Sequence, residues 1–284
     1  MNHTPDLPQM FTPRTGFLKP SDIETHLKSS IAKAEHYNIL RYEDVNEEWA
    51  AKIIDSLDKM RFNSSYRLSY SSVSLVLRLI VMPTPAHDCS AKWWRLCELD
   101  MVATGVLTPF EQAQFESNVG TTMKFTTGPY LGSVKQPDFF IRTDDEVLPS
   151  LVIEVGWSES YDDLLSDLNL LMIGGDGMIR TTIIIKLSKS TKRGVTTVNG
   201  FIELYTLNRR GIPVIKQEEV YLCTLPTNRA VQSLRLTRKE VFGPFLVNDP
   251  GRVLPVTDRV EMSIEHLRTA CTRGLQRMNL TPSE

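Results

Sequence analysis

Cysteine and long apolar runs are scarce in this sequence. Four cysteines occur among 284 residues, and none belongs to a C-x-x-C pair; they are Cys89, Cys97, Cys223 and Cys271. Zinc sites and disulfide frameworks normally show closely spaced cysteines, so we expect reduced thiols in the core. No run of about 18 apolar residues is present to cross a membrane. Met1–Pro20 also lacks the basic start and apolar middle of a signal peptide, which predicts an intracellular protein, cytoplasmic or nuclear.

A strong charge of either sign is missing as well. The chain has 32 basic and 34 acidic residues and a formal net charge of −2. This balance predicts no global attraction to nucleic acid, so a basic binding surface would have to be local. The composition, 41% hydrophobic and 23% charged, is typical of a globular protein with one large or two small domains.

The most informative stretch lies in the middle of the chain. Phe139–Thr143 and Leu151–Val155 are rich in β-branched and aromatic residues, and an acidic turn separates them, which predicts an antiparallel hairpin. If the hairpin is centred near Glu146, Asp138 lies opposite Glu154, and two carboxylates in that position repel each other. A divalent cation held by their oxygens would offset the repulsion. Exposure or hydrogen bonding of one carboxylate would offset it without a metal.

This stretch resembles the core of the PD-(D/E)XK nuclease-like superfamily. It is similar in particular to the Uma2-like branch and to fungal proteins with the pattern K-x-PD followed by P-x-L-V-x-E-V-G-x-S-E-S. The likeness covers about residues 66–208. The matching residues are Lys135, Pro137, Asp138, Pro149, Leu151, Val152, Glu154, Val155, Gly156, Ser158, Glu159 and Ser160.

The resemblance implies both a fold and a reaction. The fold would be α/β of the α+β type, a restriction-endonuclease-like core with a central mixed β-sheet flanked by helices and with helical additions at both ends. Asp138 and Glu154 would bind Mg²⁺ or Mn²⁺, and a lysine two residues after Glu154 would help to activate water. Ser158 and Glu159 are expected to cap the following helix and brace the metal site, although as part of the family pattern they could also line the pocket, as could His87.

The sequence departs from the family pattern at the lysine. Position 156 is glycine, so the attacking water and the developing charge lose a stabilising cation. Members of the superfamily relocate this lysine, and Lys186 or Lys135 is the candidate here. A strand at 181–187 is predicted to run parallel to the strand that carries Glu154, because a strand–helix–strand connection is normally a right-handed crossover. Lys186 would then reach the same end of the sheet; alternatively, either lysine merely ends a strand in water.

The start of the first core helix supplies further candidates. In the Uma2-like pattern a histidine opens this helix, which corresponds to His87 here. The helix often carries an additional acid near the metal, for which Asp88, Glu98 and Asp100 are the candidates. The alternative for His87 is a cap or a packed side chain.

Three domain segments are expected. Residues 1–20, with four prolines, predict a flexible N-terminal arm. Residues 21–224 would form the PD-(D/E)XK-like domain, with helices over about 21–36 and 46–60 as a cover. Residues 225–284 would form a C-terminal helical extension packed on the core, with helices over 237–242 and 258–278.

A serine hydrolase is the rival from another class of enzyme. Residues 156–160 lie between a strand and a helix, as in the G-x-S-x-G elbow, and Asp249 or Asp258 and then His266 follow Ser158 in the hydrolase order. Three features oppose it: serine replaces the closing glycine at Ser160, few strands precede Ser158, and no H-G motif suggests an oxyanion loop.

The sequence as a whole predicts a Mg²⁺-dependent phosphodiesterase or nuclease acting on DNA or RNA, with no membrane partner. Asp138 and Glu154 would hold the ion, Asp88 would lie nearby, and Lys186 or Lys135 would orient water or the phosphate. The alternative is a catalytically inactive pseudonuclease that serves as a binding or scaffold protein. Retention of both acids favours metal binding, whereas the loss of lysine at 156 favours lost cleavage.

Overall fold

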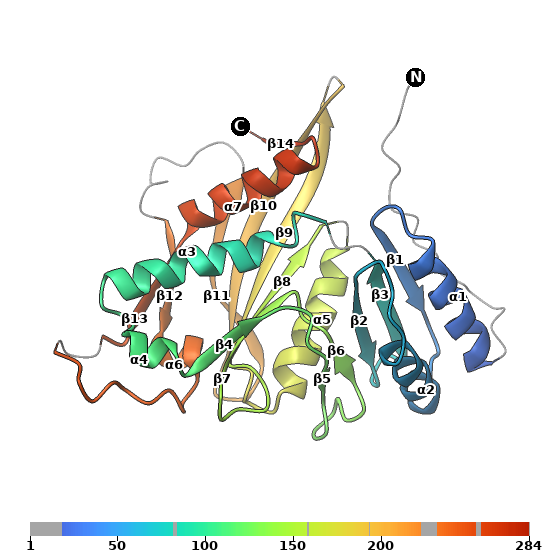
Figure 1. Cartoon of the computed structure of the whole chain (residues 1–284), viewed down its shortest axis with the longest axis horizontal. Helices are drawn as coiled ribbons and strands as arrows, with labels where there is room; N and C mark the ends of the chain where they lie inside the picture. Colours follow the sequence, from blue (N-terminus) through green and yellow to red (C-terminus); the bar gives the residue numbers. More distant parts are fainter. Residues whose placement is uncertain are drawn as a thin grey trace. The chain divides into compact units, whose positions relative to one another are not determined.

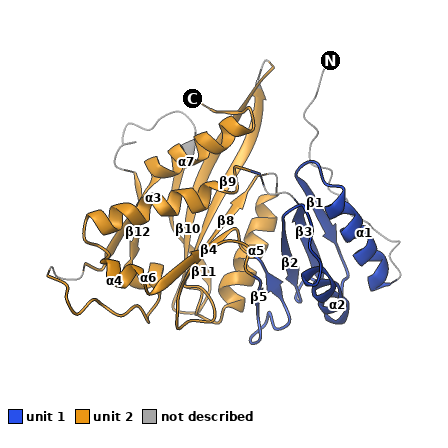
Figure 2. Ribbon diagram, viewed as in Figure 1, with its two compact units in different colours: residues 1–84, 122–136 blue, residues 85–121, 137–284 orange. Residues whose placement is uncertain are grey.

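Helices and strands alternate through the computed structural model, which describes residues 19–81, 84–157, 159–192, 194–222, 232–253 and 257–283. They form two units (Figures 1 and 2): residues 1–84 with 122–136 make unit 1, and residues 85–121 with 137–284 make unit 2. This division runs through the predicted domain of residues 21–224. The predicted arm at 1–20 lies almost entirely outside the described residues, and Pro20 already begins a helix.

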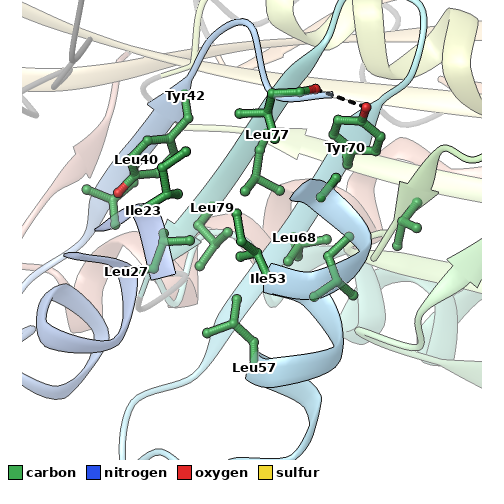
Figure 3. Packing of buried hydrophobic residues seen from close by; sticks show 14 of the residues in the cluster. Ile23, Leu27, Leu40, Tyr42, Ile53, Leu57, Leu68, Tyr70, Leu77 and Leu79 are labelled. Atoms are coloured by element: carbon green, nitrogen blue, oxygen red, sulfur yellow. Dashed lines mark hydrogen bonds between the residues drawn. The ribbon is translucent and has the colours of Figure 1, made fainter. Parts of the chain in front are cut away.

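Unit 1 is an antiparallel sheet with two helices. Its strands follow the order β1-β3-β2-β6-β5. The strands are β1 (Asn38–Tyr42), β2 (Tyr66–Ser71), β3 (Val76–Val81), β5 (Met123–Lys124) and β6 (Val134–Lys135). Helices α1 (Pro20–Ala32) and α2 (Glu47–Asp58) turn apolar side chains toward the sheet (Figure 3). The resulting core joins Leu27, Ile53 and Leu57 of the helices to Leu68 and Leu79 of the strands.

Unit 2 is built on a mixed sheet with the strand order β11-β10-β9-β8-β7-β4, to which β14 adds beside β10. The pair β8–β9 is parallel, while β4–β7, β7–β8, β9–β10 and β10–β11 are antiparallel. The strands are β4 (Phe115–Asn118), β7 (Phe139–Thr143), β8 (Leu151–Gly156), β9 (Thr181–Lys192), β10 (Val195–Leu207), β11 (Pro213–Leu222) and β14 (Thr281–Pro282). The predicted mixed sheet flanked by helices is confirmed.

Helices cover both faces of this sheet. Successive side chains of a strand point to opposite faces, so Gly156 shares a face with Glu154 and Phe139 lies on the other. Leu164 of α5 packs at Gly156, whereas Trp94 of α3 packs on Phe139. Helix α7 packs on α3. The helices of the unit are α3 (Cys89–Ala103), α4 (Pro109–Gln112), α5 (Tyr161–Gly174), α6 (Arg238–Phe242) and α7 (Ile264–Arg277).

The C-terminal segment differs from the prediction of helices alone. Strands β12 (Ser233–Thr237) and β13 (Arg259–Ser263) form a two-stranded sheet, so the helix predicted to begin at 258 begins at Ile264. Val260 and Met262 are buried while Arg259 and Glu261 are exposed, which is the period-two pattern of a strand. Ser263 then caps α7 through a hydrogen bond from the backbone nitrogen of His266.

Candidate active site

Asp138 and Glu154 meet through the register of the hairpin. Phe139 pairs with Ile153, so the next position in this register sets Asp138 opposite Glu154, as the sequence predicted. Oδ2 of Asp138 accepts a hydrogen bond of 2.8 Å from the backbone nitrogen of Val155. That nitrogen belongs to the peptide that follows Glu154, so the Asp138 carboxylate lies against the Glu154 backbone. Both carboxylates are buried, with 6% and 3% of the residue exposed.

Lys186 occupies the position beside the missing lysine. Gly156 and Lys186 are paired residues of the parallel strands β8 and β9, so the predicted parallel run is confirmed. Paired positions on neighbouring strands carry their side chains on the same face of the sheet. Glu154, two residues before Gly156, points to that face too. Lys186 on β9 therefore lies beside position 156 of β8, which is the lysine position in the resembled family pattern.

Glu159 interacts with the ammonium group of Lys186 through its backbone oxygen and its charge. Nζ donates a hydrogen bond of 2.7 Å to the backbone oxygen of Glu159. Burial lowers the pKa of Lys186, and the negative charge of Glu159 opposes this shift. Strand β9 continues to Lys192, so the alternative that Lys186 merely ends a strand in water is wrong. Glu159, a predicted pocket residue, is buried and lies near this lysine.

The packing of α5 explains why position 156 has no side chain. A Cβ atom built on Gly156 would lie 2.5 Å from Cδ1 of Leu164, far closer than van der Waals contact. A lysine at this position would therefore require Leu164 to move. Helix α5 thus packs closely on β8 at Gly156, while the lysine on this face comes from the neighbouring strand β9.

The start of α3 lies near Asp138. Asp88 is the N-cap residue of α3, and the next residue, Cys89, is fully buried. A hydrogen bond to Cys271 raises the pKa of the Cys89 thiol, with further contributions from burial and from the negative charges of Asp138 and Asp88. Asp88 itself is exposed, so its predicted role beside Asp138 and Glu154 stays a prediction.

The remaining acids of α3 are engaged elsewhere. Oε1 of Glu98 accepts a hydrogen bond from Gln112, and Oδ2 of Asp100 lies 2.7 Å from Nε2 of His266. Glu98 and Asp100 thus have partners on α4 and α7. His87 is buried in the turn that precedes α3, where its backbone oxygen accepts a hydrogen bond from Ser90.

The role predicted for two further residues, Lys135 and Ser158, stays a prediction. Lys135 is buried at the end of β6, where it pairs with Ser69 and Met123, and it belongs to unit 1, whereas Asp138 and Glu154 belong to unit 2. Ser158 lies outside the described residues.

The donor chemistry of the acidic pair fits a hard divalent ion. Within the described part of the chain, no group of three or more His, Cys, Asp or Glu side chains is arranged to hold a metal. Asp138 and Glu154 supply two carboxylates from opposed positions of the hairpin. Mg²⁺ commonly binds proteins through one or two carboxylates and keeps several waters, whereas structural zinc requires four protein ligands. The pair therefore suits Mg²⁺ or Mn²⁺.

Sequence reasoning missed a polar cluster on the same face. The hydroxyl of Tyr161 donates to Glu203 with distances of 2.9 Å to both carboxylate oxygens, and the Tyr205 hydroxyl donates at 3.0 Å. Glu203 pairs with Ile184, which pairs with Glu154, so Glu203 lies two strands away from Glu154. These residues are far apart in the sequence, and no local pattern signals their contact.

A cleft of about 470 Å³ opens between α3 and β4 on the opposite face. Trp94, Arg95, Asn118 and Phe139 are among its lining residues. Although Phe139 directly follows Asp138, strand alternation turns its ring away from the face of Glu154. The cleft is therefore separate from the acidic pair.

Comparisons of the chain with protein-family models, with curated proteins and with solved structures found no match. The resemblance to the PD-(D/E)XK superfamily therefore stays a prediction from the sequence motif.

Proposed function

We propose that this protein is a Mg²⁺-dependent phosphodiesterase of the PD-(D/E)XK type that cleaves nucleic acid, with its catalytic lysine supplied by Lys186. The observation that carries the proposal is the pairing of Lys186 with Gly156 on the face of Glu154. The acids of the motif are retained, and the missing cation is replaced from the neighbouring strand.

Each side chain has a distinct task in this proposal. Asp138 and Glu154 hold the ion, which when bound lowers the pKa of a water molecule and neutralises phosphate charge. The Val155 amide fixes one oxygen of Asp138, so the carboxylate is already oriented before a ligand arrives. Lys186 holds the attacking water or a non-bridging phosphate oxygen, while the Glu159 carbonyl orients its ammonium group. Burial strengthens these interactions because it lowers the local dielectric constant.

Cleavage assays test the proposal directly. Single- and double-stranded DNA and RNA are incubated with the full chain and Mg²⁺ or Mn²⁺. We expect cleavage that chelation abolishes and that Glu154→Gln or Lys186→Ala reduces by about 100-fold. Lys216→Ala is the matched control, because Lys216 pairs with Glu240 on the surface. Metal binding without cleavage of any substrate would contradict the phosphodiesterase and identify a pseudonuclease.

A further inference from the structure

Charge is segregated in one segment of unit 2. Residues 177–202 contain no aspartate or glutamate, although the chain as a whole has more acids than bases. The same segment contains the cations Arg180, Lys186, Lys189, Lys192 and Arg193. Residues 181–185 are buried, so only the part of the segment from Lys186 outward contributes to the surface. A surface with charges of one sign favours an anionic partner.

This segment forms a ribbon that starts at the candidate site. Strands β9 and β10 pair continuously from Thr181 to Lys192, whereas β8 pairs with β9 only as far as Lys186. The strands therefore extend beyond β8 as a long hairpin (Figure 1). Strand β14 covers the β10 side at Thr197 and Val198. Among the described strands, none pairs with β9 beyond Lys186, where the Trp157 ring lies against Lys189.

The edge of β9 from Lys186 outward carries groups that usually contact phosphates. Ser188 and Ser190 share a face with Lys186, because they follow it at intervals of two residues. Lys189 points to the other face and is exposed, and its Nζ lies 5.0 Å from the centre of the Trp157 ring. Lysine, serine and backbone amide groups supply most protein contacts to nucleic-acid backbones. A nucleic-acid strand bound along this edge would have Lys186 on one face of the sheet and Lys189 on the other.

Two aromatic rings lie beside Lys186. Phe201 is its cross-strand partner, and the rings of Phe201 and Tyr161 meet edge to face with centroids 6.0 Å apart. Both residues are partly exposed. Aromatic rings next to a basic track are typical of proteins that bind single strands, because an unpaired base stacks on a ring.

We propose that the β9–β10 ribbon from Lys186 outward is the track that binds a single-stranded nucleic acid and leads it to Asp138 and Glu154. This inference rests on the proposed function, because it takes the phosphodiester chain as the ligand. Lys189 neutralises a phosphate along the ribbon. Phe201 stacks the base nearest to Lys186.

Binding is measured separately from cleavage. Fluorescence anisotropy with the full chain and a labelled single strand of roughly 12 nucleotides is performed in excess chelator, so that metal-dependent cleavage does not occur. For Lys189→Gln we expect Kd to rise about fivefold and the slope of log K against log salt to fall by about 0.7, because each neutralised phosphate contributes about 0.7. The control is Lys52→Gln on α2, which removes the same charge from an exposed lysine and should leave Kd unchanged.

A second variant isolates the stacking contact. Phe201→Leu should weaken binding about fivefold without changing the salt slope, since stacking involves no phosphate. A duplex of the same length should bind more weakly than the single strand.

The outcomes distinguish this inference from the proposed function. If the wild-type chain binds but the ribbon variant binds equally well, the track is wrong while the phosphodiesterase still stands. Ribbon-dependent binding without metal-dependent cleavage would support the track and overturn the phosphodiesterase. Equal affinity for duplex and single strand, or no binding by the wild-type chain, would overturn the track.

Discussion

Lys186 and Gly156 are direct neighbours across the parallel strands β9 and β8. Because of this pairing, the proposed phosphodiesterase reaction can use Lys186 although position 156 is glycine. The cation reaches the face of Glu154 from the adjacent strand, while Leu164 of α5 fills the space where a side chain at 156 would start.

Moving the lysine back to position 156 should partly restore a damaged enzyme. Lys186→Ala is expected to lower kcat about 100-fold, because the site loses its cation. Adding Gly156→Lys together with Leu164→Ala supplies a lysine at the neighbouring position and removes the clash at 2.5 Å. We expect this triple variant to recover about tenfold in kcat. Steady-state cleavage kinetics provide the measurement.

The control for this series is Leu164→Ala alone, which should retain its activity if it remains folded. No recovery in the folded triple variant would argue that Lys186 acts in structure and not in chemistry.

Metal binding should depend on the acidic pair and not on the nearby acid Glu203. Calorimetric titration with Mg²⁺ or Mn²⁺ should give a binding signal for the wild-type chain and none for Asp138→Asn or Glu154→Gln, since each removes one of two charged ligands. Glu203→Gln is the matched control on the same face, because two tyrosine hydroxyls already satisfy its carboxylate. Equal signals from wild type and Glu154→Gln would exclude the site.

Stability should fall with rising pH at Glu146. Burial raises the pKa of Glu146, while a hydrogen bond to Thr143 and the charge of Arg180 oppose the shift. The folded-state pKa of Glu146 is above its unfolded value, so the protonated carboxyl group favours the folded state. This contribution to stability is complete below the unfolded pKa and is lost as pH rises through the folded pKa. Glu146→Gln should therefore be more stable than wild type at pH 7, and this gain should vanish in acid.

Urea unfolding at several pH values measures the Glu146 effect. Asp145→Asn, an exposed carboxylate in the same turn, serves as the control and should show no such pH-dependent gain. A Glu146→Gln chain that is less stable than wild type at pH 7 would disprove the argument.

Glu111 should be essential for the stability of unit 2. Its fully buried carboxylate lies 3.2 Å from Nη2 of Arg238 and 2.5 Å from Nη2 of Arg252. Glu111→Ala leaves both guanidinium groups buried without their counter-charge, so the free energy of unfolding should fall by about 3 to 5 kcal/mol. Lys216→Ala, which breaks the more exposed pair with Glu240, should cost about 1 kcal/mol or less. Similar losses for the two variants in chemical denaturation would contradict this ranking.

Sequence patterns predicted the elements around the site more accurately than the elements near the C-terminus. The hairpin register followed from two β-rich runs and a short turn, because side-chain alternation and turn length limit the possible pairings. The cap of α5 followed from Ser160, whose hydroxyl accepts the backbone hydrogen bond of Asp163. At 259–263, however, the apolar spacing suited a helix in the sequence, and pairing with β12 made it a strand. Partner strands are long-range information that local propensity does not contain.

The sequence by itself determined the two acids and their opposition across a hairpin, because neighbouring segments and a short turn set that contact. Only the tertiary structure decided which lysine joins them: Lys186 became the neighbour of Gly156 when β9 aligned in parallel with β8 after the intervening helix. It also decided that β9 continues past the site as a ribbon and that Tyr161 meets Glu203. These relationships depend on strand alignment and helix packing, which arise from contacts between residues distant in the chain.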